Sequence, residues 1–187
     1  MKRIIYNSPV ILTYTFVSLA ALILDYVTGG WTTTHFFTVY RSSFLNPLTY
    51  VRLVGHAIGH SGFTHYTNNF MMILILGPAL EEKYGSKRLL VYMLLTAAAI
   101  GIVHCLVSSG GLLGASGIVF MFIVLSSCTS IREGTVPLTL ILVLIFYLGD
   151  QVLQGVFTRD NVSQLAHILG GVMGAVFGLL RPFKNLK

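Results

Sequence analysis

Long apolar runs separated by short polar segments constrain this chain more than any other feature of its sequence. A membrane core about 30 Å thick needs roughly 20 apolar residues per helix, and several runs in the 187-residue chain approach that length. The composition points the same way, because 55% of the residues are hydrophobic and only 10% are charged, unlike soluble globular domains. The sequence therefore predicts an all-α polytopic membrane protein.

Six runs are candidates for membrane-spanning helices. They cover residues 9–27, 63–80, 89–107, 115–131, 136–153 and 164–180. Residues 28–62 form a polar and aromatic outer loop, and loops of this length usually carry structure or function. No small-residue cleavage site follows the first run, so we expect it to be a retained helix rather than a signal peptide. The sequence predicts a single membrane domain over residues 1–187.

The formal net charge of +6 has two interpretations. In a soluble protein it would suggest a nucleic acid partner, whereas in a membrane protein Lys and Arg gather in the cytoplasmic loops. With a cytoplasmic N-terminus and six spans, nine of the twelve Lys and Arg residues face the cytoplasm, and Arg41, Arg52 and Arg159 face the outside. We therefore expect both termini in the cytoplasm, the lipid bilayer as the surroundings, and no nucleic acid partner.

Four polar residues lie within the predicted spans, where such side chains are costly and suggest function. They are His65 and Asn69 in the second span, Ser116 at the start of the fourth, and His167 in the sixth. Counting about 1.5 Å per residue from the cytoplasmic charges places all four roughly 18 to 24 Å above that end. Three helices are thus predicted to bring polar groups to one level near the outer face.

These residue types predict hydrolysis by a serine nucleophile. A serine hydroxyl is a weak nucleophile until a neighbouring base takes its proton, and imidazole suits that task. Ser116 is the predicted nucleophile and His167 the predicted base. The oxyanion then needs fixed donors, which His65, Asn69 and the Ser116 backbone N–H are predicted to supply.

Glycines accompany two of these residues. Gly114 and Gly117 flank Ser116 and permit a tight loop with close backbone approach. Gly170 and Gly174 follow His167 at the spacing that lets two membrane helices come close together. We expect the sixth span to pack tightly and to bring His167 within reach of Ser116.

Each residue also has a plainer interpretation. A serine in a membrane helix most often bonds to its own backbone, and a lone histidine is as often a partner between helices as a catalyst. His56, His60 and His65 resemble a metal-binding spacing, but no carboxylate or cysteine joins them at the polar level. We therefore expect no metal.

Taken together, these residues resemble the rhomboid family of intramembrane serine proteases. The resemblance runs from about Arg52 to Gly178. Its four elements are His60-x4-His65-x3-Asn69, Gly77-x3-Glu81 with Gly85, Gly114-Ala115-Ser116-Gly117, and Ala166-His167-x2-Gly170-x3-Gly174. Four elements in the right order are far more specific than a Gly-x-Ser-Gly motif alone.

The resemblance implies a six-helix rhomboid-like bundle without cofactors in a bacterial inner membrane. It assigns Ser116 and His167 to the catalytic dyad, and His65 and Asn69 to the oxyanion donors. Arg52 and Glu81 match positions that shape the first loop and the cytoplasmic turn. The implied partners are single-pass transmembrane proteins, which are cut near the outer membrane face.

Two positions depart from the family pattern. Val51 stands where many members have Trp, and Phe120 stands where a Tyr commonly packs beside the catalytic histidine. Phe120 keeps the ring and loses the hydroxyl, so we expect activity to survive. Asp150 is expected to lie nearer the outer surface than His167 and not to act as a third catalytic residue.

Two other functions compete with proteolysis. An inactive rhomboid-like scaffold would bind transmembrane clients without cutting them, but such relatives typically lack the serine or the histidine, and this chain has both. A small transporter would use the same polar residues to bind a solute or relay protons. The sequence shows no inverted repeat and no carboxylate at the polar level, which disfavours transport.

Overall fold

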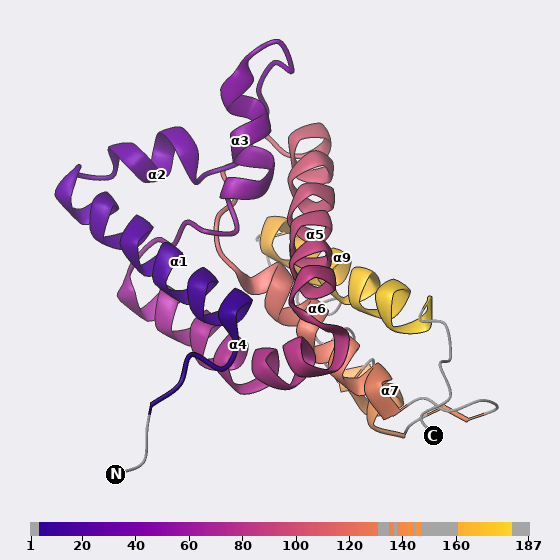
Figure 1. Cartoon of the computed structure of the whole chain (residues 1–187). Helices are drawn as coiled ribbons and strands as arrows, with labels where there is room; N and C mark the ends of the chain where they lie inside the picture. The colour runs from indigo at the N-terminus through magenta and orange to yellow at the C-terminus, as the bar shows by residue number, and fades with distance from the viewer. Residues whose placement is uncertain (1–3, 131–134, 137, 144, 147–160, 181–187) are drawn as a thin grey trace.

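The regular structure of this protein is helical. The computed structural model describes residues 4–130, 135–136, 138–143, 145–146 and 161–180. Across these ranges the β contacts are limited to one isolated bridge, between Val39 and Leu112. The helices are α1 (Pro9–Val27), α2 (Trp31–Phe36), α3 (Pro47–Gly55), α4 (Phe63–Tyr84), α5 (Ser86–Val107), α6 (Ser116–Ser127), α7 (Leu138–Val143) and α9 (Asn161–Leu179) (Figure 1).

The helix bounds depend on the residues of the first and last turns as well as on apolar runs. Helix α1 occupies the range of the first apolar run, with Pro9 at its first turn, where a missing N–H costs nothing. Helix α5 begins at Ser86, three residues before the predicted start at residue 89. Its first turn contains the charged Lys87 and Arg88, which do not belong to the apolar run. Helix α6 ends at Ser127, and a 3-10 turn over Cys128–Ser130 follows it. The run at 136–153 lies partly outside the described residues, and Asp150 lies outside them.

Helix α6 is the centre of the bundle. All of its residues from Gly117 to Leu125 are buried, and a helix that is apolar on every side belongs in a core. Helices α4, α5 and α9 surround it, and its most extensive contacts are with α9 (Figure 1). Ser116 thus begins a helix that is enclosed by its neighbours on every side.

Helices α6 and α9 meet backbone to backbone. A Cβ placed on Gly170 would lie 2.1 Å from the Gly117 carbonyl oxygen, and one placed on Gly174 would lie 2.5 Å from that of Met121. Real Cβ atoms do not approach oxygen so closely, so both glycines are required by the packing. The glycine spacing in the sixth apolar run therefore corresponds to the close packing of α9 against α6.

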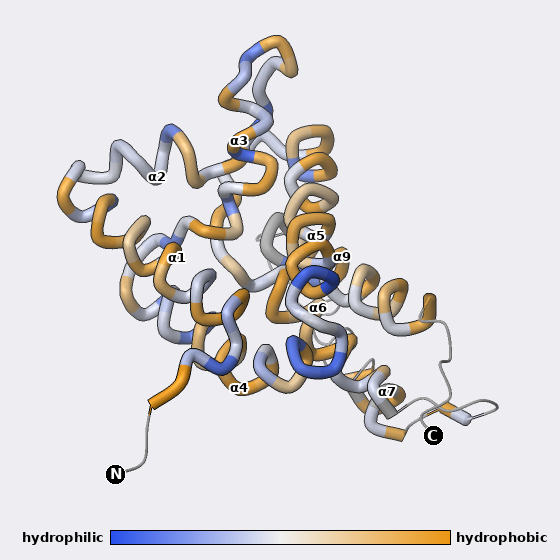
Figure 2. Tube along the Cα trace, viewed as in Figure 1, coloured by the Kyte–Doolittle hydropathy of each residue, from blue (hydrophilic) through white to orange (hydrophobic). Residues whose placement is uncertain are grey.

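The outward faces of the helices are apolar. Phe16 on α1, Ile75 on α4 and Leu95 on α5 are 58%, 65% and 48% exposed, and Figure 2 shows hydrophobic residues along these helices with hydrophilic ones at the α4–α5 junction. Soluble proteins rarely expose such extended apolar surface. Of the described helices, α1 and α5 are each long and apolar enough to cross a membrane, and α6 is apolar but shorter.

The outer loop between α1 and α4 is structured. It contains α2 and α3, which lie together at the upper side of the bundle (Figure 1). Arg52 on α3 is buried, donates through Nε to the His35 carbonyl at 2.7 Å, and lies over the Tyr40 ring at 4.5 Å. This guanidinium therefore joins α2, α3 and the segment between them.

Glu81 holds the opposite end of the bundle. Its buried carboxylate accepts hydrogen bonds from the backbone N–H groups of Val10 and Ile11, at 3.0 and 3.1 Å. The Ser86 hydroxyl donates to the same carboxylate at 2.7 Å. A carboxylate at a helix N-terminus satisfies free N–H groups and complements the helix dipole, so Glu81 fixes the starts of α1 and α5 against the end of α4.

Candidate active site

Ser116 is half-buried and occupies the first position of α6. Gly114, two residues before it, has a φ of 122°, which an L side chain adopts only with strain. The residues between α5 and α6 thereby turn sharply into the helix. The first N–H groups of a helix have no acceptor within the helix, so the serine stands beside backbone donors.

The loop that leads into Ser116 is held by the outer loop. The Gly114 N–H donates to the His56 carbonyl at 2.8 Å, and the Ala115 N–H donates to His60 Nε2 at 3.4 Å. His60 Nδ1 in turn donates to the Ile58 carbonyl at 3.1 Å. The ring of His60 therefore links the serine loop to the outer loop, a role that the sequence spacing did not indicate.

His56 and His60 are neutral supports rather than proton carriers. Both rings are almost fully buried, and burial lowers the pKa of each to about 4 because the charged form loses its hydration. For His60 the nearby His65 lowers the pKa further. Within the described ranges no three His, Cys, Asp or Glu side chains are grouped to hold a metal ion.

His167 reaches the site from α9. Its ring stacks on that of Phe120, with centroids 4.4 Å apart and an angle of 13° between the planes. The neighbours of the two predicted catalytic residues also meet, because a Cβ on Gly117 would lie 3.4 Å from the Ala166 carbonyl oxygen. The close α6–α9 pair thus brings the His167 side of α9 beside the start of α6.

His65 and Asn69 approach the serine loop from α4. A Cβ on Gly114 would lie 2.7 Å from His65 Nε2 and 3.9 Å from Asn69 Nδ2, so both side chains face the backbone two residues before Ser116. The Asn69 side chain is anchored, because Nδ2 donates to the His65 carbonyl at 3.0 Å. An amide nitrogen has a second hydrogen to offer elsewhere.

The hydrogen bonds of His65 indicate which ring nitrogen carries the proton. The Ser61 backbone N–H, which can only donate, approaches His65 Nδ1 at 3.5 Å, and the Ser61 hydroxyl lies 3.0 Å from the same atom. Nδ1 is therefore an acceptor, and in the neutral ring the proton belongs to Nε2. That places an N–H donor against Gly114.

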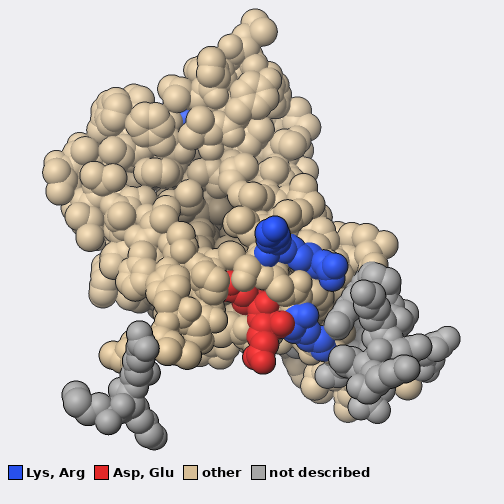
Figure 3. Space-filling model, in the orientation of Figure 1, with Lys and Arg blue, Asp and Glu red and all other residues tan. Residues whose placement is uncertain are grey.

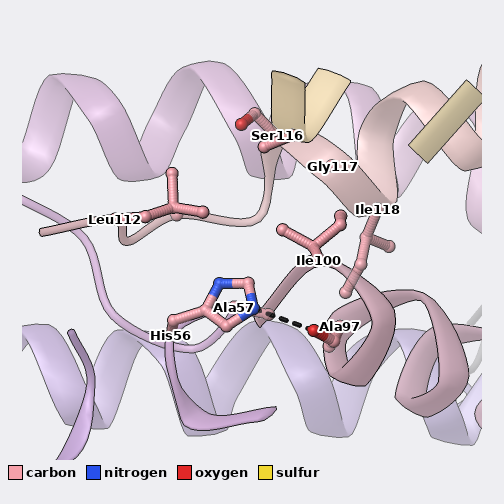
Figure 4. A pocket seen from close by; sticks show the side chains of 10 residues that line it. His56, Ala57, Ala97, Ile100, Leu112, Ser116, Gly117 and Ile118 are labelled. Atoms are coloured by element: carbon pink, nitrogen blue, oxygen red, sulfur yellow. Dashed lines mark hydrogen bonds between the residues drawn. The ribbon is translucent and has the colours of Figure 1, made fainter. Parts of the chain in front are cut away.

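A small cavity lies behind Ser116. Its volume is about 10 Å³, which is the space of one water molecule, and its lining includes Ser116, Gly117, Ile100 and Ala97 (Figure 4). His56 Nε2 donates across it to the Ala97 carbonyl at 3.0 Å. His56 Nδ1 has no hydrogen-bond partner within the described part of the chain. On the side of α5 and the outer loop, the serine therefore borders only a cavity that is too small for a substrate.

The predicted site residues thus fall into two groups. His65 and Asn69 lie against Gly114, two residues before Ser116, and His167 stacks on Phe120, one turn after Ser116. Arg52 and Glu81 lie in the outer loop and at the α4–α5 junction, away from this turn. Val51 is exposed on α3.

Comparison with known proteins identifies relatives of the same kind. Residues 47–182 match the model of the Rhomboid domain family. Rhomboid protease GluP of Bacillus subtilis is 27% identical over 182 residues, which cover 91% of this chain and 34% of that protein. RHOMBOID-like protein 5 of Arabidopsis thaliana is 30% identical over 141 residues, which cover 70% of this chain and 45% of that protein.

The chain spans about a third of the length of the Bacillus relative and less than half of that of the Arabidopsis relative. The family match nevertheless covers most of the chain and includes the serine loop, α4, α6 and α9. The chain therefore belongs to the rhomboid family.

Proposed function

We propose that this protein is an intramembrane serine endopeptidase that cuts transmembrane proteins near the outer membrane face. The observation that carries the proposal is the meeting of α4, α6 and α9 side chains at the start of α6. His65 and Asn69 face Gly114, and His167 is stacked on Phe120 one turn after Ser116. The proposed nucleophile, base and oxyanion donors thus come from three separate helices.

In the proposed reaction, Ser116 Oγ attacks the carbonyl carbon of a substrate peptide bond while His167 takes its proton. The resulting oxyanion accepts hydrogen bonds from His65 Nε2, Asn69 Nδ2 and the Ser116 backbone N–H. His167 then protonates the leaving amine, and the C–N bond breaks. A water molecule, activated by His167, releases the acyl group and restores the hydroxyl. This chemistry needs no metal or organic cofactor.

The proposed substrates are single-pass transmembrane proteins. A peptide bond in a helix is shielded by its own hydrogen bonds, so the substrate must unwind locally before Ser116 can attack. Helix-destabilising and small residues near the cut are therefore expected. The proposed setting is a six-span bundle in a bacterial inner membrane, with both termini in the cytoplasm.

The first test is fluorophosphonate labelling of the detergent-purified chain, followed by intact mass. We expect one adduct on the parent and none on Ser116→Ala or His167→Ala. Ser126→Ala, which removes another serine of α6, is the control and is expected to label like the parent. Thermal unfolding checks that each variant is folded.

An unlabelled but folded parent would favour the inactive scaffold over the protease. In that case, capture of transmembrane clients without cleavage becomes the function to measure. Labelling that persists in Ser116→Ala would place the nucleophile at another serine and reject the proposed dyad.

A further inference from the structure

A second, larger hollow lies on the membrane-facing side of the molecule. The groove has a volume of about 460 Å³ and runs between α1 and α5, beneath the end of α3. Its walls are almost entirely apolar and include Val17, Leu90, Met93 and Leu94. Figure 3 shows the molecule hollowed between these helices.

The length of the groove fits one leaflet of a bilayer. It extends along α5 from Ser86 to Ala97, a rise of about 16 Å, and half of the hydrocarbon core is about 15 Å. Val54, Ala57 and Ile58 at the end of α3 close its deep end. A chain that enters beside Ser86 therefore ends near the middle of the membrane.

The open end of the groove is basic. Ser86 also lines a wide surface depression that includes Lys87 and Arg88, and both cations are exposed. Figure 3 shows Lys and Arg side chains beside the hollow, with Asp and Glu side chains close below them. Glu82 is exposed but does not line the depression. The nearby Glu81 carboxylate is buried and accepts three hydrogen bonds, so it does not compete for an anion at the surface.

We propose that this groove binds an anionic phospholipid, whose acyl chain fills the space between α1 and α5 and whose phosphate pairs with Lys87 and Arg88. An apolar slot of one-leaflet length that opens at two cations matches both parts of such a lipid. Basic residues at the membrane surface attract anionic head groups. The proposal does not depend on the proposed proteolysis.

The test is native mass spectrometry of the full chain with phosphatidylglycerol or phosphatidylcholine that carry the same acyl chains. We expect about tenfold tighter binding of phosphatidylglycerol, because two cations contribute. The double substitution Lys87→Gln, Arg88→Gln is expected to remove this preference. Arg41→Gln, which removes an exposed cation at the other end of the molecule, is expected to keep it.

The proposed position of the acyl chain is tested by a bulky side chain that occupies the groove. Val17 lines the groove and is 46% exposed, whereas Ile23 on the same helix is 54% exposed and does not line it. Val17→Trp is expected to weaken binding of both lipids at least about tenfold, with Ile23→Trp like the parent. Ala97 is left unchanged because it also lines the cavity behind Ser116.

A photoactivatable phosphatidylglycerol with a diazirine in its acyl chain tests the parent chain directly, whether or not Val17→Trp folds. Crosslinks in the α5 peptide that contains Leu90 and Leu94 support the proposal. Equal affinity for the two lipids, Val17→Trp binding like Ile23→Trp, or crosslinks spread evenly over the outward faces would overturn it. Displacement of the crosslink by a transmembrane peptide, but not by excess phosphatidylglycerol, would assign the groove to a protein helix instead.

Discussion

Single residues decide whether the proposed oxyanion is stabilised. His65 Nε2 and Asn69 Nδ2 both face Gly114, and removal of one oxyanion donor typically lowers kcat about 10²- to 10³-fold. We expect His65→Ala and Asn69→Ala each to lower kcat by that order, with little change in KM, in steady-state cleavage of a transmembrane substrate.

Asn68→Ala is the matched control, because Asn68 is the exposed neighbour on the same helix. It is expected to keep the parent kcat. Parent-like kcat in both His65→Ala and Asn69→Ala would remove these side chains from the mechanism.

The two buried loop histidines make stability depend on pH. Burial holds the pKa of His56 and His60 at about 4, below the value of about 6.5 in an unfolded chain. Between these values the unfolded chain binds more protons, so the free energy of unfolding falls as the pH falls. We expect the Tm in detergent to decrease from pH 6.5 to pH 4 and to level off below.

His35 supplies the comparison for this pH series, because its side chain is partly exposed on α2. His56→Asn is expected to flatten the pH dependence, and His35→Asn to leave it unchanged. An equal slope in the parent and in His56→Asn would contradict the assignment to this ring.

The sequence predicted the proposed catalytic residues but not the residues that support them. Ser116, His65, Asn69 and His167 stand out because polar groups inside membrane spans need a reason. His56 suggested only a metal-binding spacing, and His60 was one position of the family motif with no role assigned to it. Their role depends on the return of residues 114–115 to the outer loop, a contact across 55 positions of sequence for Ala115 and His60, which local patterns do not encode.

Among the helices, the α6–α9 pair is the least tolerant contact. A Cβ on Gly170 would meet the Gly117 carbonyl oxygen at 2.1 Å, so Gly170→Ala must push the helices apart. Overpacking of this kind costs about 1–3 kcal/mol or more. We expect a lower Tm and at least about tenfold slower fluorophosphonate labelling, because His167 moves with α9.

Val172→Ala is the control on the same helix, since Val172 is 47% exposed. It is expected to label at the parent rate. Normal labelling by a folded Gly170→Ala would show that the dyad tolerates a wider helix spacing.

Helix positions followed from apolar runs, and so did both ends of α1, but the runs missed the charged end of α4 and the charged start of α5. The charged first turn of α5 was excluded from the predicted span because Lys87 and Arg88 are not apolar. The resemblance placed Glu81 at the cytoplasmic turn, but its bonds to Val10 and Ile11 join residues about 70 positions apart. Hydropathy therefore predicts where a span lies, but it does not predict which residues cap the helix or which distant residues contact it.

For the molecule as a whole, the distribution of Lys and Arg predicts the orientation in the membrane. Thr28 follows α1 and Lys87 lies in the first turn of α5, and both side chains are exposed. In intact cells we expect Thr28→Cys to react with an impermeant maleimide and Lys87→Cys to react only after permeabilisation. The parent chain is the control, because its Cys105 and Cys128 are buried.

The opposite labelling pattern would invert the proposed topology. It would also move the basic end of the lipid groove to the outer leaflet, while the distances within the site would stay the same. Orientation is therefore a property of the chain in its membrane, separate from the packing of α6 against α9.

The bridge between Val39 and Leu112 links the outer loop to the segment before the serine. The Val39 N–H donates to the Leu112 carbonyl at 3.0 Å, and the Leu112 N–H donates to the Val39 carbonyl at 2.9 Å. Both bonds use main-chain atoms, so side chains at these two positions can diverge over evolution without breaking the link. Proline, which has no N–H to donate, is the one natural residue whose arrival at either position would remove one of the two bonds.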